Sequence, residues 1–289
     1  MKILLTGKSG QVGWELQRTL APLGEVIAVN RQALDLANPD AIRALIRQVK
    51  PALIVNPAAH TAVDKAESEP ELAMAVNGIA PGIMAEEAKR LGAAMIHYST
   101  DYVFDGGKTT PYTEKDMPNP GNVYGKTKLA GEQAIQAVGI PHLILRTSWV
   151  YGTRGRNFLL TILRLAQERD ELKIVDDQVG APTSSRMIAE ATAQILAQTR
   201  GNLGGSSGIY HLTAAGQTSW YGFAAAILES QARATGVAGA RLTPIPTSDY
   251  PLPAPRPMYS VMANDKLQRA FGVAIPAWQN GLNLCMEEM

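Results

Sequence analysis

The sequence has a single cysteine, almost no net charge and no long apolar run. Cys285 alone cannot form an internal disulfide, which is typical of a reducing compartment, and it lies far from any catalytic signature. A formal net charge of +1 argues against binding nucleic acid or a membrane surface through bulk electrostatics. No apolar run approaches the roughly 18 residues of a membrane span, and the first strand pattern leaves no room for a signal peptide. We therefore expect a soluble, cytoplasmic, globular protein.

Short apolar segments alternate with helical patterns through the first half of the 289 residues, of which 46% are hydrophobic. The expected strands are 3–5, 26–29, 53–55, 95–98 and 143–146. The expected helices are 14–20, 39–48, 71–91 and 124–138, the second of them capped by Asn38. This alternation predicts an α/β fold with a Rossmann-type, doubly wound, mostly parallel sheet.

Three glycines spaced three residues apart follow the first expected strand: Gly7, Gly10 and Gly13. Gly7 would permit a tight turn, and Gly10 would let the backbone approach a pyrophosphate at the beginning of a helix. Gly13 would let that helix pack close to the sheet. The spacing is a close variant of the dinucleotide-binding pattern G-x-G-x-x-G. A purely structural turn is the alternative, and the position after the first strand favours nucleotide binding.

The end of the second strand bears on the choice of cofactor. In dinucleotide folds an acid there binds the 2′-hydroxyl of the adenosine ribose, whereas an arginine accepts a 2′-phosphate. This chain has Asn30 and Arg31 and no carboxylate at that point. The sequence therefore favours NADPH, with NADH left open, and Asp35 and Leu36 are candidate adenine contacts.

Tyr124 and Lys128 lie four residues apart in an expected helix, so they share a face with their Cβ atoms about 5–6 Å apart. A fixed cation beside a phenol favours the phenolate, and we predict that Lys128 lowers the pKa of Tyr124. Tyr124 would then serve as a general acid. On its own, Y-x-x-x-K occurs by chance on many helices, and it becomes specific only together with the glycine motif.

The segment 97–106 follows a buried strand and therefore falls at the carboxyl edge of the sheet, where doubly wound folds bind ligands. Within it, Thr100 or Ser99 could hold a substrate carbonyl while the phenol of Tyr124 protonates it. The alternative is a pair of hydroxyls that cap the following turn.

The pattern is looser after residue 146. Helices are expected at 158–167, 187–196 and 220–230, and the glycine-rich loop 201–208 leads into a strand at 209–212 that returns to the sheet. Residues 244–257 hold six prolines and are not expected to form regular structure. We predict a nucleotide-binding domain of residues 1–150 plus roughly 185–215. A smaller, partly interleaved substrate domain would comprise residues 151–184 plus 216–289.

Several longer stretches resemble the extended short-chain dehydrogenase/reductases. They are the glycine motif and residues 99–106 and 124–132. Three further stretches, 56–67, 146–151 and 177–183, are similar to the dTDP-4-dehydrorhamnose reductase family within that superfamily. The resemblance covers essentially the whole chain. It implies reduction of the C4 keto group of a dTDP-4-keto-6-deoxy sugar by a nicotinamide cofactor, in dTDP-rhamnose biosynthesis.

The resemblance also implies roles for individual residues. Thr100, Tyr124 and Lys128 would form the catalytic triad, and the sugar would contact Thr100, Asp101 and Trp149. The cofactor would lie against Gly7, Gly10, Gln11, Val12, Asn30, Arg31, Asp35, Leu36, Ala59, His60, Thr61, Tyr98, Tyr124 and Lys128. From the residues alone, Trp149 is interpreted as a core aromatic and His60 as a loop histidine. Candidates for the substrate diphosphate, each more typical of a solvated surface, are Arg154, Arg156, Asn157 and Arg256.

Some members of this family dimerise around a magnesium ion held by glutamates, one of which follows the segment 180–183. Here Arg186 stands where that acid is expected, leaving Glu15, Glu287 and Glu288 as possible oxygen ligands. Because Mg²⁺ prefers oxygen donors, a guanidinium at that point opposes it. We therefore predict no metal and either a monomer or a metal-independent dimer, in which Arg186 could pair with a carboxylate across the interface.

Two other functions are compatible with the same motifs. A nucleotide-sugar epimerase or dehydratase of this superfamily is one, but a 4,6-dehydratase would want a second acid where Tyr102 follows Asp101. A non-catalytic regulatory subunit that kept the fold is the other. The intact pair of Tyr124 and Lys128 and the glycine loop argue against it.

Overall fold

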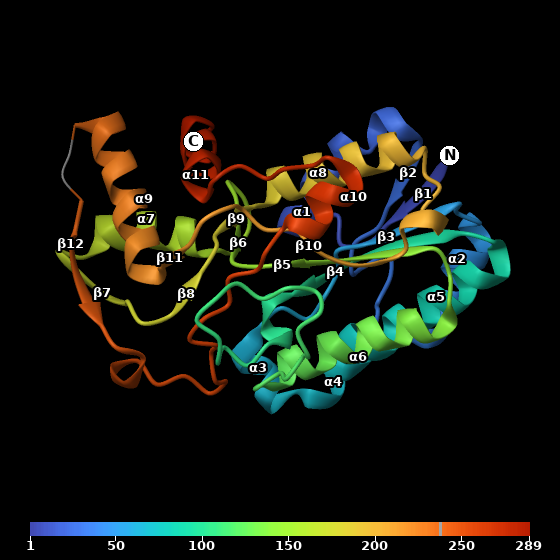
Figure 1. Cartoon of the computed structure of the whole chain (residues 1–289), viewed down its shortest axis with the longest axis horizontal. Coiled ribbons are helices and arrows are strands. Elements are labelled where there is room, and N and C mark those ends of the chain that lie inside the picture. The colour runs from blue at the N-terminus through green and yellow to red at the C-terminus, as the bar shows by residue number, and fades with distance from the viewer. Residues whose placement is uncertain (237–238) are drawn as a thin grey trace.

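Six parallel strands form the central sheet of the computed structural model, which describes residues 1–236 and 239–289 (Figure 1). Across the sheet their order is β2 (Glu25–Ala28), β1 (Lys2–Leu5), β3 (Leu53–Asn56), β4 (Ala94–Thr100), β5 (His142–Thr147) and β10 (Gly208–His211). The chain winds in opposite directions from β1, with β2 on one side and β3 on the other, and ligands bind at such a switch point. The doubly wound sheet and the return of the chain to it at β10 are confirmed, and the five expected strands end within two residues of their predicted bounds.

Helices cover both faces of this sheet (Figure 1). On one face lie α1 (Gln11–Thr19) and α8 (Ser185–Thr199); on the other lie α2 (Pro39–Val49), α5 (Ala80–Leu91) and α6 (Val123–Val138). Each face of the sheet has its own apolar core, and strand β1 contributes to both. Ile3 and Leu5 pack under α1 and α8, whereas Leu4 packs under α2 and α5. Burial on both faces explains why these strands are continuously apolar in the sequence.

Local signals define the ends of several helices. The side chain of Asn38 accepts hydrogen bonds from the N–H groups of Asp40 and Ala41, so it caps α2 as predicted.

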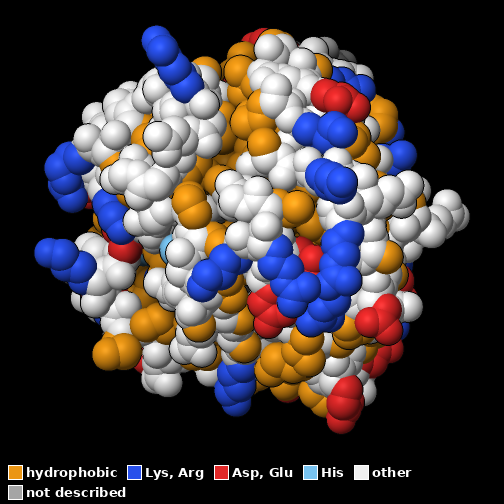
Figure 2. Space-filling view, turned by 90° about the vertical axis from the view of Figure 1, so that its right-hand side faces the viewer, with side chains coloured by type: hydrophobic (Ala, Val, Ile, Leu, Met, Phe, Trp, Pro, Cys, Tyr) orange, Lys and Arg blue, Asp and Glu red, His pale blue; other side chains and the backbone are white. Residues whose placement is uncertain are grey.

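On the exposed side of α2, Arg43, Arg47 and α5 residue Arg90 converge on the buried carboxylate of Glu87. Figure 2 shows this end of the molecule, where basic side chains gather around acidic ones.

The helix expected at 71–91 is interrupted, and this prediction is wrong in detail. Short helices α3 (Val63–Ser68) and α4 (Pro70–Met74) come first, and a π-helical segment, Ala75–Ile79, then leads into α5. Pro81 has no N–H to donate to the carbonyl of Asn77 four residues earlier, so the regular hydrogen-bond pattern cannot continue. π-Helical turns are frequent at functional sites.

The remaining elements form a smaller region at the left of Figure 1. It contains α7 (Phe158–Glu168), α9 (Trp220–Thr235) and three two-stranded sheets, which pair β7 (Glu171–Val175) with β12 (Arg241–Ile245), β8 (Val179–Gly180) with β11 (Thr218–Ser219), and β6 (Val150–Tyr151) with β9 (Thr183–Ser184). Strand β12 includes Pro244, so the prediction that residues 244–257 form no regular structure is wrong at this point. A proline is tolerated because each strand of a two-stranded sheet is an edge strand.

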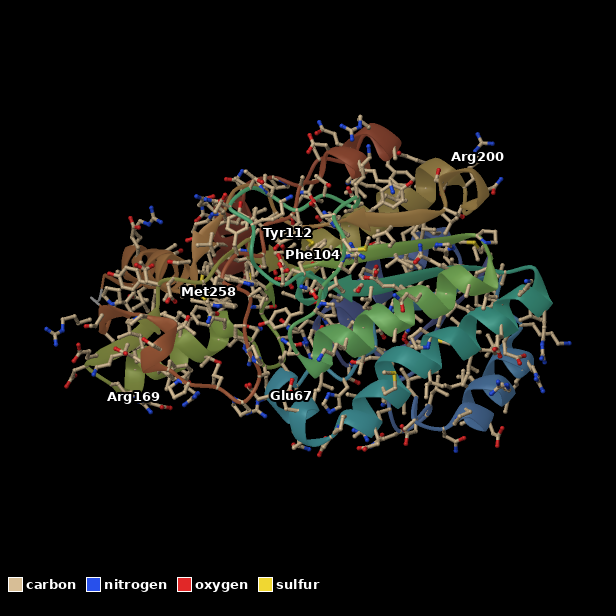
Figure 3. The ribbon with its side chains drawn as sticks, turned by 60° about the horizontal axis from the view of Figure 1, so that its bottom comes forward. Glu67, Phe104, Tyr112, Arg169, Arg200 and Met258 are labelled. Carbon is tan, nitrogen blue, oxygen red and sulfur yellow. The ribbon has the colours of Figure 1, made fainter. Side chains whose placement is uncertain are left out.

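Two C-terminal helices complete the chain, α10 (Asp265–Phe271) against β10 and α11 (Trp278–Glu287) beside α9. Figure 3 shows Arg169 near one end of the molecule and Arg200 near the other, with Phe104 and Tyr112 between them. These two rings stack with their centroids 4.2 Å apart. Within the described residues, no helix has the length and apolar character needed to cross a membrane.

Candidate active site

A cavity of about 730 Å³ runs along the carboxyl ends of the central strands into the smaller region. Every residue predicted for the cofactor or the sugar lines it, namely Gly7, Gly10, Gln11, Val12, Asn30, Arg31, Asp35, Leu36, Ala59, His60, Thr61, Tyr98, Thr100, Asp101, Tyr124, Lys128 and Trp149. Residues that sequence reasoning missed also line it, among them Tyr102, Ser148 and Trp220. The predicted residues therefore belong to one continuous space.

The glycine loop forms one end of the cavity. Gly7 has a left-handed backbone, with φ of +61°, and its carbonyl accepts a hydrogen bond from the N–H of Gly10. A Cβ on Gly13 would lie 2.1 Å from the carbonyl oxygen of Gly7, so Gly13 lets the helix approach the turn that follows β1. Gly10 precedes α1 without a side-chain cap, which leaves the first N–H groups of the helix open to an anion.

The residues after β2 form the next part of the wall. The side-chain oxygen of Asn30 accepts a hydrogen bond from the N–H of Ala33, and Asp35 Oδ1 accepts one from Ala37. Arg31 is exposed at the cavity and makes no ion pair with a described residue. A free guanidinium at this point is able to receive a phosphate.

The loop that contains Ala59, His60 and Thr61 is held by the π-helical segment. Asn77 accepts a hydrogen bond from the N–H of His60 at 2.8 Å and donates one to the carbonyl of His60 at 3.1 Å. The same amide donates to Thr127 Oγ1, next to Lys128, at 3.2 Å. Asn77 thus joins this loop to α6, a role that no local motif in the sequence indicated.

Helix α6 carries Tyr124 and Lys128 on one face, and its first turn is capped twice. Asn122 accepts a hydrogen bond from the N–H of Gly125 at 2.8 Å, and Glu67 accepts one from the N–H of Val123 at 2.8 Å. Glu67 is labelled in Figure 3, on the segment that lies beside α6. These two caps fix the position of Tyr124 at the beginning of the helix.

Thr100 lies at the end of β4 and contacts the phenol of Tyr124. Its hydroxyl donates a hydrogen bond to Asp101 Oδ1 at 3.0 Å and accepts one from the N–H of Tyr102 at 3.1 Å. This hydroxyl therefore caps the turn and also lies at the cavity; that it holds a substrate carbonyl stays a prediction. Ser99 Oγ, by contrast, is buried and has no hydrogen-bond partner among the described residues.

The predicted effect of Lys128 on Tyr124 is wrong in this structure. Burial raises the pKa of Tyr124 to about 12, the hydrogen bond to Thr100 lowers it, and the charge of Asp101 raises it further. Burial also lowers the pKa of Lys128 to about 8. Lys128 is not among the groups that shift the pKa of Tyr124, and its Nζ donates to the carbonyl of Tyr98 at 2.6 Å.

Asp101 is a buried carboxylate at the centre of the cavity wall. Burial raises its pKa to about 6, although hydrogen bonds from Ser260 and Thr100 act in the opposite direction. Its Oδ2 atom has no hydrogen-bond partner among the described residues. A carboxylate oxygen in this state is available to a ligand hydroxyl.

Trp149 is not a core aromatic, as the residues alone suggested, but a half-buried residue of the cavity wall. Its backbone is left-handed, with φ of +45°, and its ring stacks on Trp220 with centroids 3.5 Å apart. A Cβ on Gly180 would lie 2.5 Å from the ring of Trp149, so only glycine fits there. Trp220 Nε1 donates to Gln178 Oε1, which fixes the stack to the β7–β8 turn.

The four candidates for the diphosphate lie in different surroundings. Arg156 lines the cavity, whereas Arg154 stacks over Trp14 outside it, 3.6 Å from the ring centroid. Arg256 is paired with Asp64 at 2.7 Å. Asn157 caps α7 and donates to Gln11 Oε1 at 2.9 Å, so it links the glycine loop to the smaller region.

Arg186 lies between two of the three glutamates considered as metal ligands. Its Nε is 3.6 Å from Glu15 Oε2, and its guanidinium also pairs with Glu288. These carboxylates belong to the same chain, so the arginine is paired without an interface. In the described parts of the chain, no group of three or more His, Cys, Asp or Glu side chains is placed to hold a metal ion.

Comparison with known proteins agrees with this geometry. The sequence matches the family described as the RmlD substrate binding domain over residues 1–289. The chain belongs to this family. It is 50% identical to a dTDP-4-dehydrorhamnose reductase of Burkholderia thailandensis, covering 100% of this chain and 99% of the relative. It is 48% identical to the reductase of Escherichia coli K12, with coverage of 100% and 98%.

Solved structures give the same result. A dTDP-4-dehydrorhamnose reductase of Clostridium acetobutylicum superposes with a TM-score of 0.91 at 41% identity, covering 100% of this chain and 99% of that one. The enzyme of Bacillus anthracis, solved in complex with NADP, has a TM-score of 0.91 at 32% identity with the same coverage. The predicted family and fold class are confirmed, and the chain is an oxidoreductase of the extended short-chain dehydrogenase/reductase superfamily.

Proposed function

We propose that the chain reduces the C4 keto group of dTDP-4-dehydro-6-deoxy-L-mannose (dTDP-4-dehydrorhamnose) to dTDP-L-rhamnose with NADPH. The observation that carries this proposal is that Tyr124, Thr100 and Lys128 line the same cavity as the glycine loop. A hydride donor held by the loop and a proton donor on α6 can therefore act on one carbonyl group. The names of the relatives support the choice of sugar.

The residues of the cavity fit a nicotinamide dinucleotide. The uncapped beginning of α1 and the glycine loop would receive the pyrophosphate, and Asn30, Asp35 and Leu36 would surround the adenosine. Arg31, exposed and with no acid beside it in the loop after β2, would bind a 2′-phosphate and so favour NADPH over NADH. NADPH, when bound, supplies the hydride.

The side chains of the cavity would supply the rest of the chemistry. The hydroxyl of Thr100 would hold the carbonyl oxygen, and Tyr124 would donate its proton to that oxygen as the alkoxide forms. With a pKa of about 12, the phenol keeps its proton at neutral pH and is ready to donate it. Lys128 would hydrogen-bond the nicotinamide ribose.

The sugar would lie between Thr100 and the stacked tryptophans. Asp101 would accept a hydrogen bond from a sugar hydroxyl, Trp149 would contact the ring, and Arg156 would meet the diphosphate.

We further propose that residues 1–150 and roughly 185–215 form the cofactor domain and that 151–184 and 216–289 form the substrate domain, of which 237–238 lie outside the described residues. Cytoplasmic location, the absence of Mg²⁺ and a monomer or metal-independent dimer stay predictions, and unchanged sedimentation with EDTA would support the last two.

The test is the absorbance of reduced nicotinamide with purified protein, NADPH and dTDP-4-dehydrorhamnose generated in situ. We expect oxidation that yields dTDP-L-rhamnose, a loss of about 10²–10⁴-fold in kcat in Tyr124→Phe, and nearly unchanged NADPH affinity in that variant. Near-normal turnover by Tyr124→Phe would refute the assignment of the acid. NADPH binding without turnover would favour a regulatory subunit, and turnover of another keto sugar would replace the substrate only.

A further inference from the structure

A chain of four buried polar side chains runs beneath the cavity, from the glycine loop to Lys128. Thr6 follows β1, Asn56 ends β3, His97 lies in β4 opposite Asn56, and Lys128 comes from α6. Each of the four is at most 2% exposed. Because β1, β3 and β4 are neighbours in the sheet, the chain crosses its centre (Figure 1).

Every link of this chain is a hydrogen bond of ordinary length. Thr6 Oγ1 and Asn56 Oδ1 are 2.6 Å apart, and Asn56 Nδ2 and His97 Nδ1 are 3.1 Å apart. His97 Nε2 lies 3.2 Å from Lys128 Nζ, which also donates to the carbonyl of Tyr98. The imidazole therefore has one partner on each nitrogen, and water does not reach it.

Counting donors and acceptors restricts the chain to two arrangements. Burial and the charge of Lys128 hold the pKa of His97 well below its ordinary value, so its ring carries one proton. If Asn56 donates to Nδ1, that proton is on Nε2, and Lys128 must be a neutral amine in order to accept it. If the amide of Asn56 is turned by half a rotation, it accepts from Nδ1 and donates to Thr6, and Nε2 accepts from Lys128; of the two arrangements, only this one is compatible with a Lys128 ammonium.

We propose that His97, anchored by Asn56 and Thr6, is a positioning residue that determines whether Lys128 is held as an ammonium or as a neutral amine. The amide of Asn56 stays bonded to His97 and to Thr6 in either state by turning, so Lys128 can gain or lose a proton without breaking these two links. An amide does not itself carry a proton along, so the chain is an anchor and not a proton path. The importance of this control for catalysis rests on the proposed role of Lys128 in the reductase.

Other charged groups around Lys128 do not provide the same control. Glu132, one turn further along α6, favours the ammonium, but its carboxylate is paired with Arg146 of β5 at 2.6 Å. Tyr124 lies one turn before Lys128, and Asp101 influences Tyr124 from the end of β4. Among the described residues, His97 is the titratable side chain within hydrogen-bond distance of Lys128 Nζ.

The direct test is an NMR titration of ¹³Cε-labelled lysines in the whole protein, with Lys128 assigned from the Lys128→Arg spectrum. His97→Leu removes this partner from both forms of Lys128, and because the ammonium makes the stronger hydrogen bond, we expect the pKa of Lys128 to fall by about one unit or more. His97→Gln keeps an oxygen or amide group near the position of Nε2 and should restore most of the shift. The control is His211→Leu, since His211 is equally buried, lies on β10 and does not contact Lys128.

A second variant keeps the proposal testable if His97→Leu does not fold. Asn56→Asp can only accept, so it fixes the His97 proton on Nδ1 and leaves Nε2 to accept from the ammonium. We expect this variant to raise the pKa of Lys128, and to move the alkaline limb of kcat/KM to higher pH, while His97→Leu moves that limb to lower pH.

The proposal is overturned if Lys128 titrates at the wild-type pH in both His97→Leu and Asn56→Asp, or if His211→Leu produces the same shift. Because the NMR titration needs no substrate, it also separates this proposal from the proposed function. A wild-type protein that reduces no sugar, yet shows opposite shifts in the two variants, would refute the reductase and keep the role of His97.

Discussion

The two ends of the cavity are built from different parts of the polypeptide. At the end proposed to bind the cofactor the wall is mainly backbone: Gly7 makes the turn, Gly10 leaves the beginning of α1 uncapped, and Gly13 lets the helix approach. At the end proposed to bind the sugar the wall consists of side chains, above all the stack of Trp149 and Trp220, held by small sheets. A backbone wall depends on local spacing, whereas a side-chain wall depends on contacts between distant segments. The two ends should therefore respond to substitution in different ways.

The largest effect on ligand binding is expected when a side chain is added to the backbone wall at Gly13. In Gly13→Ala the new methyl group would lie 2.1 Å from the carbonyl oxygen of Gly7, so the loop must move. Overpacking of this kind costs about 1–3 kcal/mol, and we expect NADPH affinity, measured by fluorescence titration, to fall up to roughly 100-fold. Gly121→Ala is the control, because a Cβ there meets nothing within 4 Å. Unchanged affinity in Gly13→Ala would show that the loop is not the pyrophosphate site.

A smaller effect, on the preference for NADPH over NADH, is expected from Arg31, the exposed cation at the same end. Arg31→Ala removes the proposed partner of the 2′-phosphate, and a hydrogen bond to a charged group is worth about 1.5–3 kcal/mol. The ratio of kcat/KM for NADPH to that for NADH should therefore drop at least about tenfold, with the value for NADH nearly constant. An equal loss with both cofactors would mean that Arg31 supports the fold of the loop instead.

At the sugar end, acidity should reveal the role of Asp101. Its carboxyl has a pKa of about 6, so it is charged above that pH and neutral below it. Protonation removes the carboxylate that would accept a hydrogen bond from a sugar hydroxyl. The value of kcat/KM should therefore fall by about tenfold for each pH unit below 6. NADPH affinity should not follow this profile. Asp101→Asn should be slow at every pH and lack this acid limb; a wild-type limb in that variant would exclude Asp101 as its source.

The smallest effect is expected from the aromatic stack. An aromatic pair contributes about 0.5–1.5 kcal/mol beyond its buried area, so Trp220→Ala should raise KM for the sugar nucleotide about two- to tenfold. NADPH affinity should stay constant, because Trp220 lies away from the glycine loop. Trp14→Ala, outside the cavity, is the matched control. A change in NADPH affinity alone would mean that the two ends do not act separately.

The difference between the ends also explains what the sequence could reveal. The glycine spacing and the pair of Tyr124 and Lys128 are local sequence patterns. The regular geometry of strands and helices determines where such residues lie, so these positions could be predicted from the sequence. Trp220 follows an ordinary helix cap, and nothing near it indicates a partner in Trp149. The expected pKa of Tyr124 was wrong for a related reason: the spacing to Lys128 was visible, but the burial of the phenol and the engagement of the ammonium by Tyr98 depend on tertiary packing.

Asn77 has a consequence for how ligands bind in the cavity. A single amide holds the backbone of His60 on one side and Thr127 of α6 on the other. Tightening the loop around a dinucleotide must therefore also tighten the helix that bears Tyr124, and by thermodynamic linkage the reverse holds with equal strength. We therefore expect cooperative binding, in which the dinucleotide and the sugar nucleotide each raise the affinity of the protein for the other by the same factor.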